Sequence, residues 1–309
     1  MSFTSDIKNE LCAYQTKKAC CAFAELSAIV CFGAHIRNNC LVLRTENKSF
    51  AERISSLTHR VFGFRAVIIT KATPGLFEVQ IANEETLPRV LEAFGMVKNS
   101  RDMKNFVAFS LPDSVSEKPC CMHAVFRGAF LTCGSCAEPE KRYHLEISTN
   151  HFRLSKTLLK MMEENEIQGK IITRKANYVV YLKGADYIHD FLGYAGAMKS
   201  VVVLEETRVT KDFKNNINRK VNFELANLTK SINAGAEQAA AIRFIEDTIG
   251  ISSLDDSLKE VAYLRLENPD ASLSELLKLL SEPISKSGLN HRLKKLSDIA
   301  ERLKRRKRL

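Results

Sequence analysis

AELSAIVCFGAHI, at Ala24–Ile36, returns about 100 residues further on as AVFRGAFLTCGSC, at Ala124–Cys136. The two segments share one pattern of apolar and small residues, and Gly33 aligns with Gly134. Self-similarity at a fixed spacing indicates a repeated structural unit. We therefore expect two copies of one fold, each beginning with an apolar helix that is dense in small residues.

The segments downstream follow the same order in both copies. Periodicity predicts an alternating strand, a helix, a hairpin of two strands and a closing helix. The ranges are Asn39–Thr45, Lys48–Phe62, Val67–Thr70, Phe77–Ile81 and Leu87–Gly95 in the first copy, and Arg142–Thr149, His151–Asn165, Lys170–Thr173, Tyr178–Leu182 and Ile188–Gly196 in the second. The loops are too short for parallel crossovers, so we expect antiparallel sheets.

The two copies predict an α+β fold with a pseudo-twofold axis, in which residues 1–105 form one repeat and residues 106–205 the other. The composition then changes, because residues 206–225 are polar, basic and rich in Asn, which is typical of a linker. We expect residues 226–309 to form an all-α domain. Its predicted helices are Ala226–Ile249, with a candidate interruption at Gly235, then Asp256–Leu266, Ser272–Leu280 and Ser285–Leu303.

The last two of these helices have the layout of a helix-turn-helix at about residues 272–304. Ser272 and Glu275 form a capping box at the start of the shorter helix. Pro283 lies in the short connection, and a helix ends before the residue that precedes a proline. One face of the longer helix is apolar at steps of three and four residues. That stripe consists of Leu289, Leu293, Leu296, Ile299 and Leu303.

The opposite face of the longer helix carries the candidate DNA-binding residues. In a helix-turn-helix the first turns of the second helix contact base edges in the major groove, where Asn pairs with adenine and Lys with guanine. The candidates for base edges are Ser287, Asn290, His291 and Lys294. The candidates for phosphate contacts are Ser285, Lys286, Arg292, Lys295, Arg305, Arg306 and Arg308.

The distribution of charge supports a nucleic-acid partner. The formal net charge is +10, and residues 285–309 hold ten Lys and Arg against two acids, a net charge of +8. A basic block of this density favours a polyanion. Two alternatives stay open at this point: a solubilising tail, and an amphipathic helical hairpin that binds a protein.

Three segments resemble the bacterial WhiA family of transcription regulators. They are VFRGAFLTCGSCAEPEKRYHLEIST (125–149), RKVNFELANLTKSINAGAEQ (219–238) and ASLSELLKLLSEPISKSGLNHRLKKLSDIAERL (271–303). The resemblance spans nearly the whole chain. It implies a duplicated domain similar to LAGLIDADG homing endonucleases, tethered to a C-terminal helix-turn-helix. It also implies roles in cell division, chromosome segregation and sporulation.

The resemblance allows a test for catalysis. In homing endonucleases the first helix of each repeat ends in an acid just before a glycine, and this acid holds the catalytic metal ions. The corresponding positions here are Phe32 and Cys133. Neither side chain offers the oxygen ligands that Mg²⁺ prefers. We therefore expect no catalytic residues and no nuclease activity.

The resemblance also marks a basic group in the middle of the chain. Arg219, Lys220, Asn222 and Lys230 match the family there. These residues are candidates for DNA phosphate contacts, and a role in helix capping or domain packing is the alternative.

We expect the cysteines to be buried and to bind no metal. All nine lie in the first 136 residues, and an odd number without a secretory signal indicates reduced thiols. Cys120, Cys121, Cys133 and Cys136 offer four thiolates for zinc. Burial suits them better, because two of them are adjacent and Cys133 lies on the first helix of the second repeat. The sequence also lacks GxxxxGK[ST] and GxGxxG motifs, so we expect no cofactor.

We therefore interpret the sequence as that of a sequence-specific DNA-binding regulator of bacterial transcription. Double-stranded DNA is the expected partner, and RNA polymerase or a sigma factor is the candidate protein partner. A cytoplasmic, nucleoid-associated location follows, because no apolar run has the length of a membrane helix. The oligomeric state stays open. The alternatives are a nucleoid-type architectural DNA binder and a protein-interaction scaffold with a basic tail.

Overall fold

The computed structural model describes residues 2–96 and 110–306, so the expected boundary between the repeats lies outside the described residues. The chain divides into two compact units, with the boundary between Asp212 and Phe213. Among the described residues, none of the helices is both long and apolar enough to cross a membrane.

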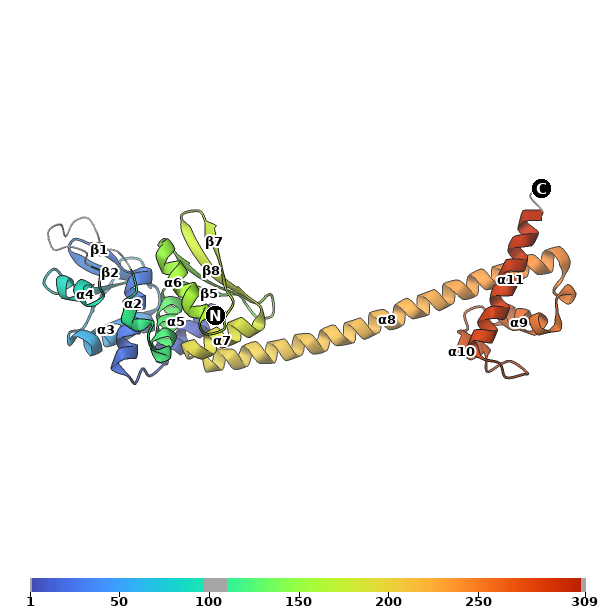
Figure 1. The fold of residues 1–309 in the computed structure, drawn as a ribbon, viewed down its shortest axis with the longest axis horizontal. Coiled ribbons are helices and arrows are strands. Elements are labelled where there is room, and N and C mark those ends of the chain that lie inside the picture. Colours follow the sequence, from blue (N-terminus) through green and yellow to red (C-terminus); the bar gives the residue numbers. More distant parts are fainter. Residues whose placement is uncertain (1, 97–109, 307–309) are drawn as a thin grey trace. The chain divides into compact units, whose positions relative to one another are not determined.

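The first unit contains the two predicted repeats (Figure 1). The first repeat consists of α1 (Phe3–Ala13), α2 (Ala19–Gly33), β1 (His35–Arg37), β2 (Cys40–Thr45), α3 (Lys48–Phe62), β3 (Val67–Thr70), β4 (Phe77–Ala82) and α4 (Leu87–Ala93). The second consists of η1 (Asp113–Val115), α5 (Pro119–Cys133), β5 (Gly134–Cys136), β6 (His144–Thr149), α6 (Phe152–Glu163), β7 (Lys170–Arg174), β8 (Asn177–Lys183) and α7 (Ala185–Ala195). From α2 and α5 onward both repeats follow the predicted order, except that the short strands β1 and β5 were not predicted.

Each repeat builds one antiparallel sheet, and the two sheets have the same strand order. The order is β1-β2-β4-β3 in the first sheet and β5-β6-β8-β7 in the second. The register pairs Leu43 with Val79 in the first and Ile147 with Val180 in the second. These four side chains are buried, so each sheet turns an apolar face toward the core.

The axis helices α2 and α5 pack closely at their small residues. A Cβ atom on Gly128 would lie 2.6 Å from the backbone oxygen of Glu25 and 2.9 Å from the Cβ of Ala28. A Cβ on Gly33 would collide with the side chain of Thr132. The two helices approach as closely as they do because these positions carry no side chain.

Two details of the axis helices differ from the prediction. The helices end at Gly33 and Cys133, and the residues that follow form the short strands β1 and β5. Ser135, which belongs to the segment predicted as an apolar helix, therefore lies in β5. Both strands have only three residues, which is too short for the alternation that identifies a strand in a sequence.

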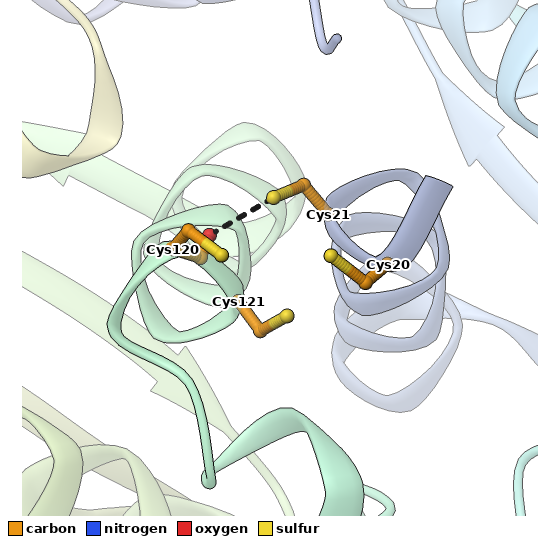
Figure 2. Close-up of side chains that lie close together, drawn as sticks. All are labelled: Cys20, Cys21, Cys120 and Cys121. Carbon is orange, nitrogen blue, oxygen red and sulfur yellow. Dashed lines mark hydrogen bonds between the residues drawn. The ribbon is translucent and has the colours of Figure 1, made fainter. Parts of the chain in front are cut away.

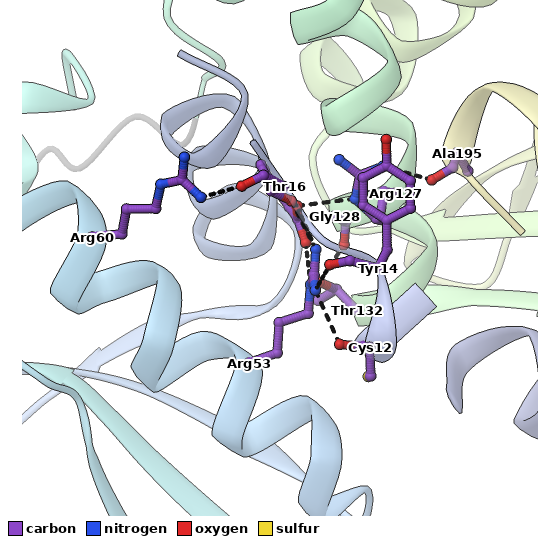
Figure 3. A network of polar contacts seen from close by, with 10 residues as sticks. Cys12, Tyr14, Thr16, Arg53, Arg60, Arg127, Gly128, Thr132 and Ala195 are labelled. Carbon is purple, nitrogen blue, oxygen red and sulfur yellow. Dashed lines mark hydrogen bonds and ion pairs between the residues drawn. The ribbon is translucent and has the colours of Figure 1, made fainter. Parts of the chain in front are cut away.

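A buried ion network joins the two repeats beside the axis (Figure 3). The carboxylate of Glu25 on α2 is fully buried and accepts hydrogen bonds from Arg53 on α3 and from Arg127 Nε on α5, the latter at 2.9 Å. Arg53 also donates to the carbonyl oxygens of Cys12 and Tyr14, at 3.0 and 2.7 Å. One carboxylate thus satisfies two buried cations from different repeats, as burial of charge requires.

The second unit is helical, and α8 (Met198–Ile249) leads into it as one continuous helix. The helix starts where the carboxylate of Glu10 accepts the backbone N–H groups of Lys199 and Ser200, at 2.6 and 2.9 Å. An anion at this end is favoured by the helix dipole. The remaining elements are η2 (Ile251–Ser253), α9 (Asp256–Glu267), α10 (Leu273–Leu276) and α11 (Lys286–Arg306).

Three expectations for this region need correction. Residues 206–225 are helical, not an irregular linker, because they contain neither Pro nor Gly to stop the helix that begins at Met198. The helix also runs through Gly235 without interruption. The predicted helix Ser272–Leu280 ends at Leu276, where Lys278 and Leu279 bond three residues back, to Glu275 and Leu276, and the chain leaves the helix.

Candidate nucleic-acid interface

A small apolar core positions α11 in the second unit. Its buried face consists of Leu289, Leu293, Leu296 and Ala300, while the predicted Ile299 and Leu303 are half-buried at the edge. The opposing side chains come from α8, α9 and α10, and include Ile242, Ile245, Leu258, Val261 and Leu276. Each large apolar side chain buried here contributes about 1.5–3 kcal/mol. This packing fixes which face of α11 points to solvent.

The candidate base-edge residues all lie on the exposed part of α11. Ser287, Asn290, His291 and Lys294 are exposed. They are spaced three, one and three residues apart in the first turns of the helix, so they share one surface opposite the apolar stripe. All four side chains offer hydrogen-bonding groups, and Lys294 also carries a positive charge.

Ser285 acts as the N-cap of α11. Its hydroxyl accepts the backbone N–H of Gly288 at 3.1 Å and lies 2.9 Å from the hydroxyl of Ser287. A Ser at this position satisfies one of the free N–H groups at the helix start. The Ser285 hydroxyl is thus already in use as the cap. A phosphate at this end would bind mainly to the remaining backbone N–H groups and to the exposed Lys286.

The remaining candidates for phosphate contacts differ in whether they already form an ion pair. Lys295 is exposed but forms an ion pair with Asp255, at 3.2 Å. Arg305 and Arg306 are both exposed, and Arg305 pairs with Glu301 one turn earlier, at 3.7 Å. Arg308 lies outside the described residues. The exposed pairs are open to competition from a DNA phosphate, because surface ion pairs stabilise a fold by only about 0–1 kcal/mol.

Arg292 is half-buried and lies near α9. Hydrogen bonds from the backbone and side chain of Ser281 lower the pKa of Glu260, and the positive charge of Arg292 lowers it further. The backbone N–H of Ser281 donates to the Glu260 carboxylate at 2.6 Å. This carboxylate fastens the connection between α10 and α11, which sequence analysis did not foresee.

The turn after α9 depends on a buried arginine and a glycine. Arg265 is 2% exposed, and its Nη1 donates to the carbonyl oxygen of Ala271 at 2.6 Å and to those of Asn268 and Pro269 at 3.3 Å. The backbone of Pro269 lies against Gly235 on α8 so closely that a Cβ there would collide with the carbonyl oxygen. Gly235 therefore serves close packing, and no signal in the sequence pointed to Arg265.

The capping box at α10 is present as predicted. The hydroxyl of Ser272 accepts the backbone N–H of Glu275, and the Glu275 carboxylate accepts the backbone N–H of Ser272 at 2.8 Å. Hydrogen bonds from the backbone and the side chain of Ser272 lower the pKa of the Glu275 carboxyl, the bond from the backbone most strongly. The box fixes the start of the first helix of the motif.

The basic group in the middle of the chain lies on α8. Arg219, Lys220, Asn222 and Lys230 are all exposed and occupy the interior of the helix. An interior position does not cap a helix, so the capping alternative does not apply to them. The structure leaves all four side chains accessible to solvent.

A groove in the first unit contains both positions that the sequence resemblance aligns with the endonuclease acids. Phe32 and Cys133, at the ends of α2 and α5, both line it. Burial raises the pKa of the Cys133 thiol to about 12, which keeps it protonated. The described lining contributes the cations Lys8, Arg44 and Lys48, and Glu46 is the single carboxylate among its described residues. This is a poor set of ligands for Mg²⁺.

The four cysteines weighed for zinc do not come together. Cys120 and Cys121 begin α5, while Cys133 ends it and Cys136 lies in β5. Twelve or thirteen residues of helix correspond to about 20 Å. These four thiols cannot bind one ion.

Comparisons with known proteins agree with both units. Two family models match, the WhiA LAGLIDADG-like domain over residues 122–214 and the WhiA C-terminal HTH domain over residues 217–300. The chain is 38% identical to a protein named "Probable cell division protein WhiA" from Alkaliphilus metalliredigens, over 98% of each chain. It is also 38% identical to the protein of the same name from Ruminiclostridium cellulolyticum, over 99% of each chain.

A solved structure shows the same fold. The crystal structure of full-length DUF199/WhiA from Thermatoga maritima is similar with a TM-score of 0.60 and 24% sequence identity, over 98% of this chain and 99% of that chain. The similarity confirms the predicted fold class, a duplicated α+β domain followed by a helix-turn-helix.

Proposed function

Because this chain belongs to the WhiA family, we propose that it is a sequence-specific DNA-binding regulator of transcription whose α11 enters the major groove. The observation that carries the proposal is the exposed surface formed by Ser287, Asn290, His291 and Lys294 on a helix whose opposite face is fixed by the core. Side chains at these positions reach base edges in a helix-turn-helix. A firmly packed helix presents them in one register.

The cations around that surface hold the DNA backbone in this proposal. Lys286 at the N-terminal end of α11 and Arg305 and Arg306 near its C-terminal end are exposed, and each phosphate contact releases counterions. Lys295 exchanges its ion pair with Asp255 for a phosphate. The exposed Arg219, Lys220, Asn222 and Lys230 of α8 extend the same role.

The first unit acts without nuclease chemistry in this proposal. Phe32 and Cys133 replace the acids of the endonuclease motif, and three cations line the same groove. Incubation of supercoiled DNA with the chain and Mg²⁺ should leave the DNA intact. Cleavage that EDTA abolishes would contradict this part of the proposal.

The regulated genes belong to cell division, chromosome segregation and sporulation in this proposal, since similar proteins are named for cell division. A regulator acts on transcription through RNA polymerase or a sigma factor. Because the surface of α11 in the second unit is assigned to DNA, we assign this protein contact to the first unit. The site of action is then the chromosome in the cytoplasm.

The test is a double variant, His291→Ala with Lys294→Ala. We expect each lost base contact to cost about 1–3 kcal/mol, or roughly 5- to 150-fold in Kd. Affinity is measured by fluorescence anisotropy on the duplex that the unchanged chain enriches from a random library. Arg302→Ala is the matched control, because Arg302 is an exposed cation of α11 two turns beyond Lys294. Equal affinities of the double variant and the unchanged chain would overturn the groove assignment.

A further inference from the structure

Four thiols from the two repeats gather at one end of the axis helices. The Sγ atoms of Cys20, Cys21, Cys120 and Cys121 all lie within 4.8 Å of one another. Figure 2 shows the side chains directed into the space between the first turns of α2 and α5. Cys20 and Cys21 are the second and third residues of α2, and Cys120 and Cys121 are the second and third residues of α5. The cluster is thus a product of the duplication.

From this geometry we propose that Cys20, Cys21, Cys120 and Cys121 bind one Zn²⁺ ion as a tetrathiolate. Four sulfur ligands in a tetrahedron form a structural zinc site. Bonds of about 2.3 Å from zinc to sulfur place the sulfurs about 3.8 Å apart. The present separations of at most 4.8 Å require the thiols to close by only about 1 Å.

The helix ends beside the cluster suit the charge of a zinc tetrathiolate. A zinc ion with four thiolates carries a net charge of about −2, and the N-terminal ends of two helices carry partial positive charge. The residues that cap these ends are Lys18 and Lys118, and neither side chain forms a capping hydrogen bond. The N-terminal ends of two helices thus lie at the cluster.

The accessibility of the cluster also fits a metal site. Cys21 and Cys121 are buried, while Cys20 and Cys120 are half-buried, so an ion can enter and then be shielded. The Cys21 thiol donates to the carbonyl oxygen of Cys120 at 3.3 Å. Zinc binding replaces that proton, and the thiol protons pass to solvent. Thiolate ligands select zinc over Mg²⁺ or Ca²⁺.

The site differs from the metal site of an endonuclease. Phe32 and Cys133 lie at the opposite ends of α2 and α5, about 18 Å from the thiols along each helix. An ion held by Cys20 and Cys21 of one repeat and Cys120 and Cys121 of the other fastens the repeats together. Its role is structural, because all four ligand positions are filled by protein.

The experiment measures metal binding by the full-length chain, purified with a reductant and without chelator. Elemental analysis should find one zinc per chain. After removal of the zinc, titration with Co²⁺ should give the visible absorption bands and the sulfur charge-transfer band of a tetrathiolate, and Zn²⁺ should abolish them. The double variant Cys20→Ser with Cys120→Ser should lose both the stoichiometric zinc and the tetrathiolate spectrum.

Cys40→Ser is the matched control, because Cys40 is a half-buried cysteine on β2 outside the cluster, and it should keep one zinc per chain. If the double variant fails to fold, the cobalt spectrum of the unchanged chain still decides. Absence of zinc and of cobalt bands would overturn the proposal. Intact mass showing a disulfide among the four cysteines in the freshly isolated chain would also overturn it.

Discussion

The substitution Gly235→Ala has two opposing effects on the stability of the second unit. Gly235 lies in the interior of α8, and Ala in place of an interior Gly stabilises a helix by about 1 kcal/mol. The same change introduces a Cβ that collides with the carbonyl oxygen of Pro269 and lies 3.2 Å from Nη1 of Arg265. The outcome depends on whether the turn after α9 can move.

The contacts of that turn indicate that it cannot move freely. Arg265 Nη1 holds three carbonyl oxygens between Asn268 and Ala271, and hydrogen bonds from a charged group contribute about 1.5–3 kcal/mol each. Overpacking alone costs about 1–3 kcal/mol. Loss of one such bond together with overpacking exceeds the gain in helix propensity. We expect a net destabilisation of about 2 kcal/mol in the second unit.

Differential scanning calorimetry of the full-length chain measures this difference. For a unit of about 100 residues, 2 kcal/mol lowers Tm by roughly 8–16 °C. Asn233→Ala is the control, because Asn233 is an exposed interior residue of α8 and should gain up to about 0.7 kcal/mol from propensity. A Gly235→Ala chain whose second unit melts at or above the unchanged temperature would refute the packing argument.

Three further expectations concern charge. Glu25→Gln leaves two buried arginines without their carboxylate, so calorimetry should show the first unit destabilised by about 3–5 kcal/mol; a loss below about 1 kcal/mol would argue against the network. Arg305→Ala with Arg306→Ala should weaken binding to all duplexes alike and reduce the salt slope by about 1–2, as measured by anisotropy; a loss confined to one sequence would contradict it. Hydrogen bonds from backbone N–H groups, the largest cause, lower the pKa values of Glu260 and Glu275 below 4.5. These two carboxylates therefore stabilise the second unit fully above that pH, and the stabilisation is lost as the pH falls through their lowered pKa values. The midpoint of urea unfolding should drop on acidification, and a midpoint that rises would contradict this expectation.

Periodicity within a repeat was sufficient to predict most of the first unit. Lys48–Phe62 was predicted with the bounds of α3, because its apolar residues follow the helical period. In the structure the side chain of Asn47 caps this helix. The helix α1 was not predicted, although Phe3, Ile7 and Leu11 recur every four residues and are buried. That spacing is the signal that would have found it.

Features that depend on contacts between distant segments could not be predicted. Cys20 and Cys120 are 100 residues apart in the chain, and only the pairing of α2 with α5 brings their thiols together. In the candidate interface the leucine spacing predicted a helix and its outward face, although α11 runs from Lys286 to Arg306 and not from Ser285 to Leu303. The roles of Glu260 and Arg265 depend on loops whose path no local pattern specifies.

Selection of a random duplex library on the full-length chain at near-physiological salt tests the central claim most directly. Sequencing of the retained DNA should reveal an enriched motif, because α11 presents one register of side chains to the groove. Retention of DNA without any enriched motif would contradict sequence reading and indicate an architectural binder. Absence of retention at low salt as well would indicate that the basic surface serves a protein partner.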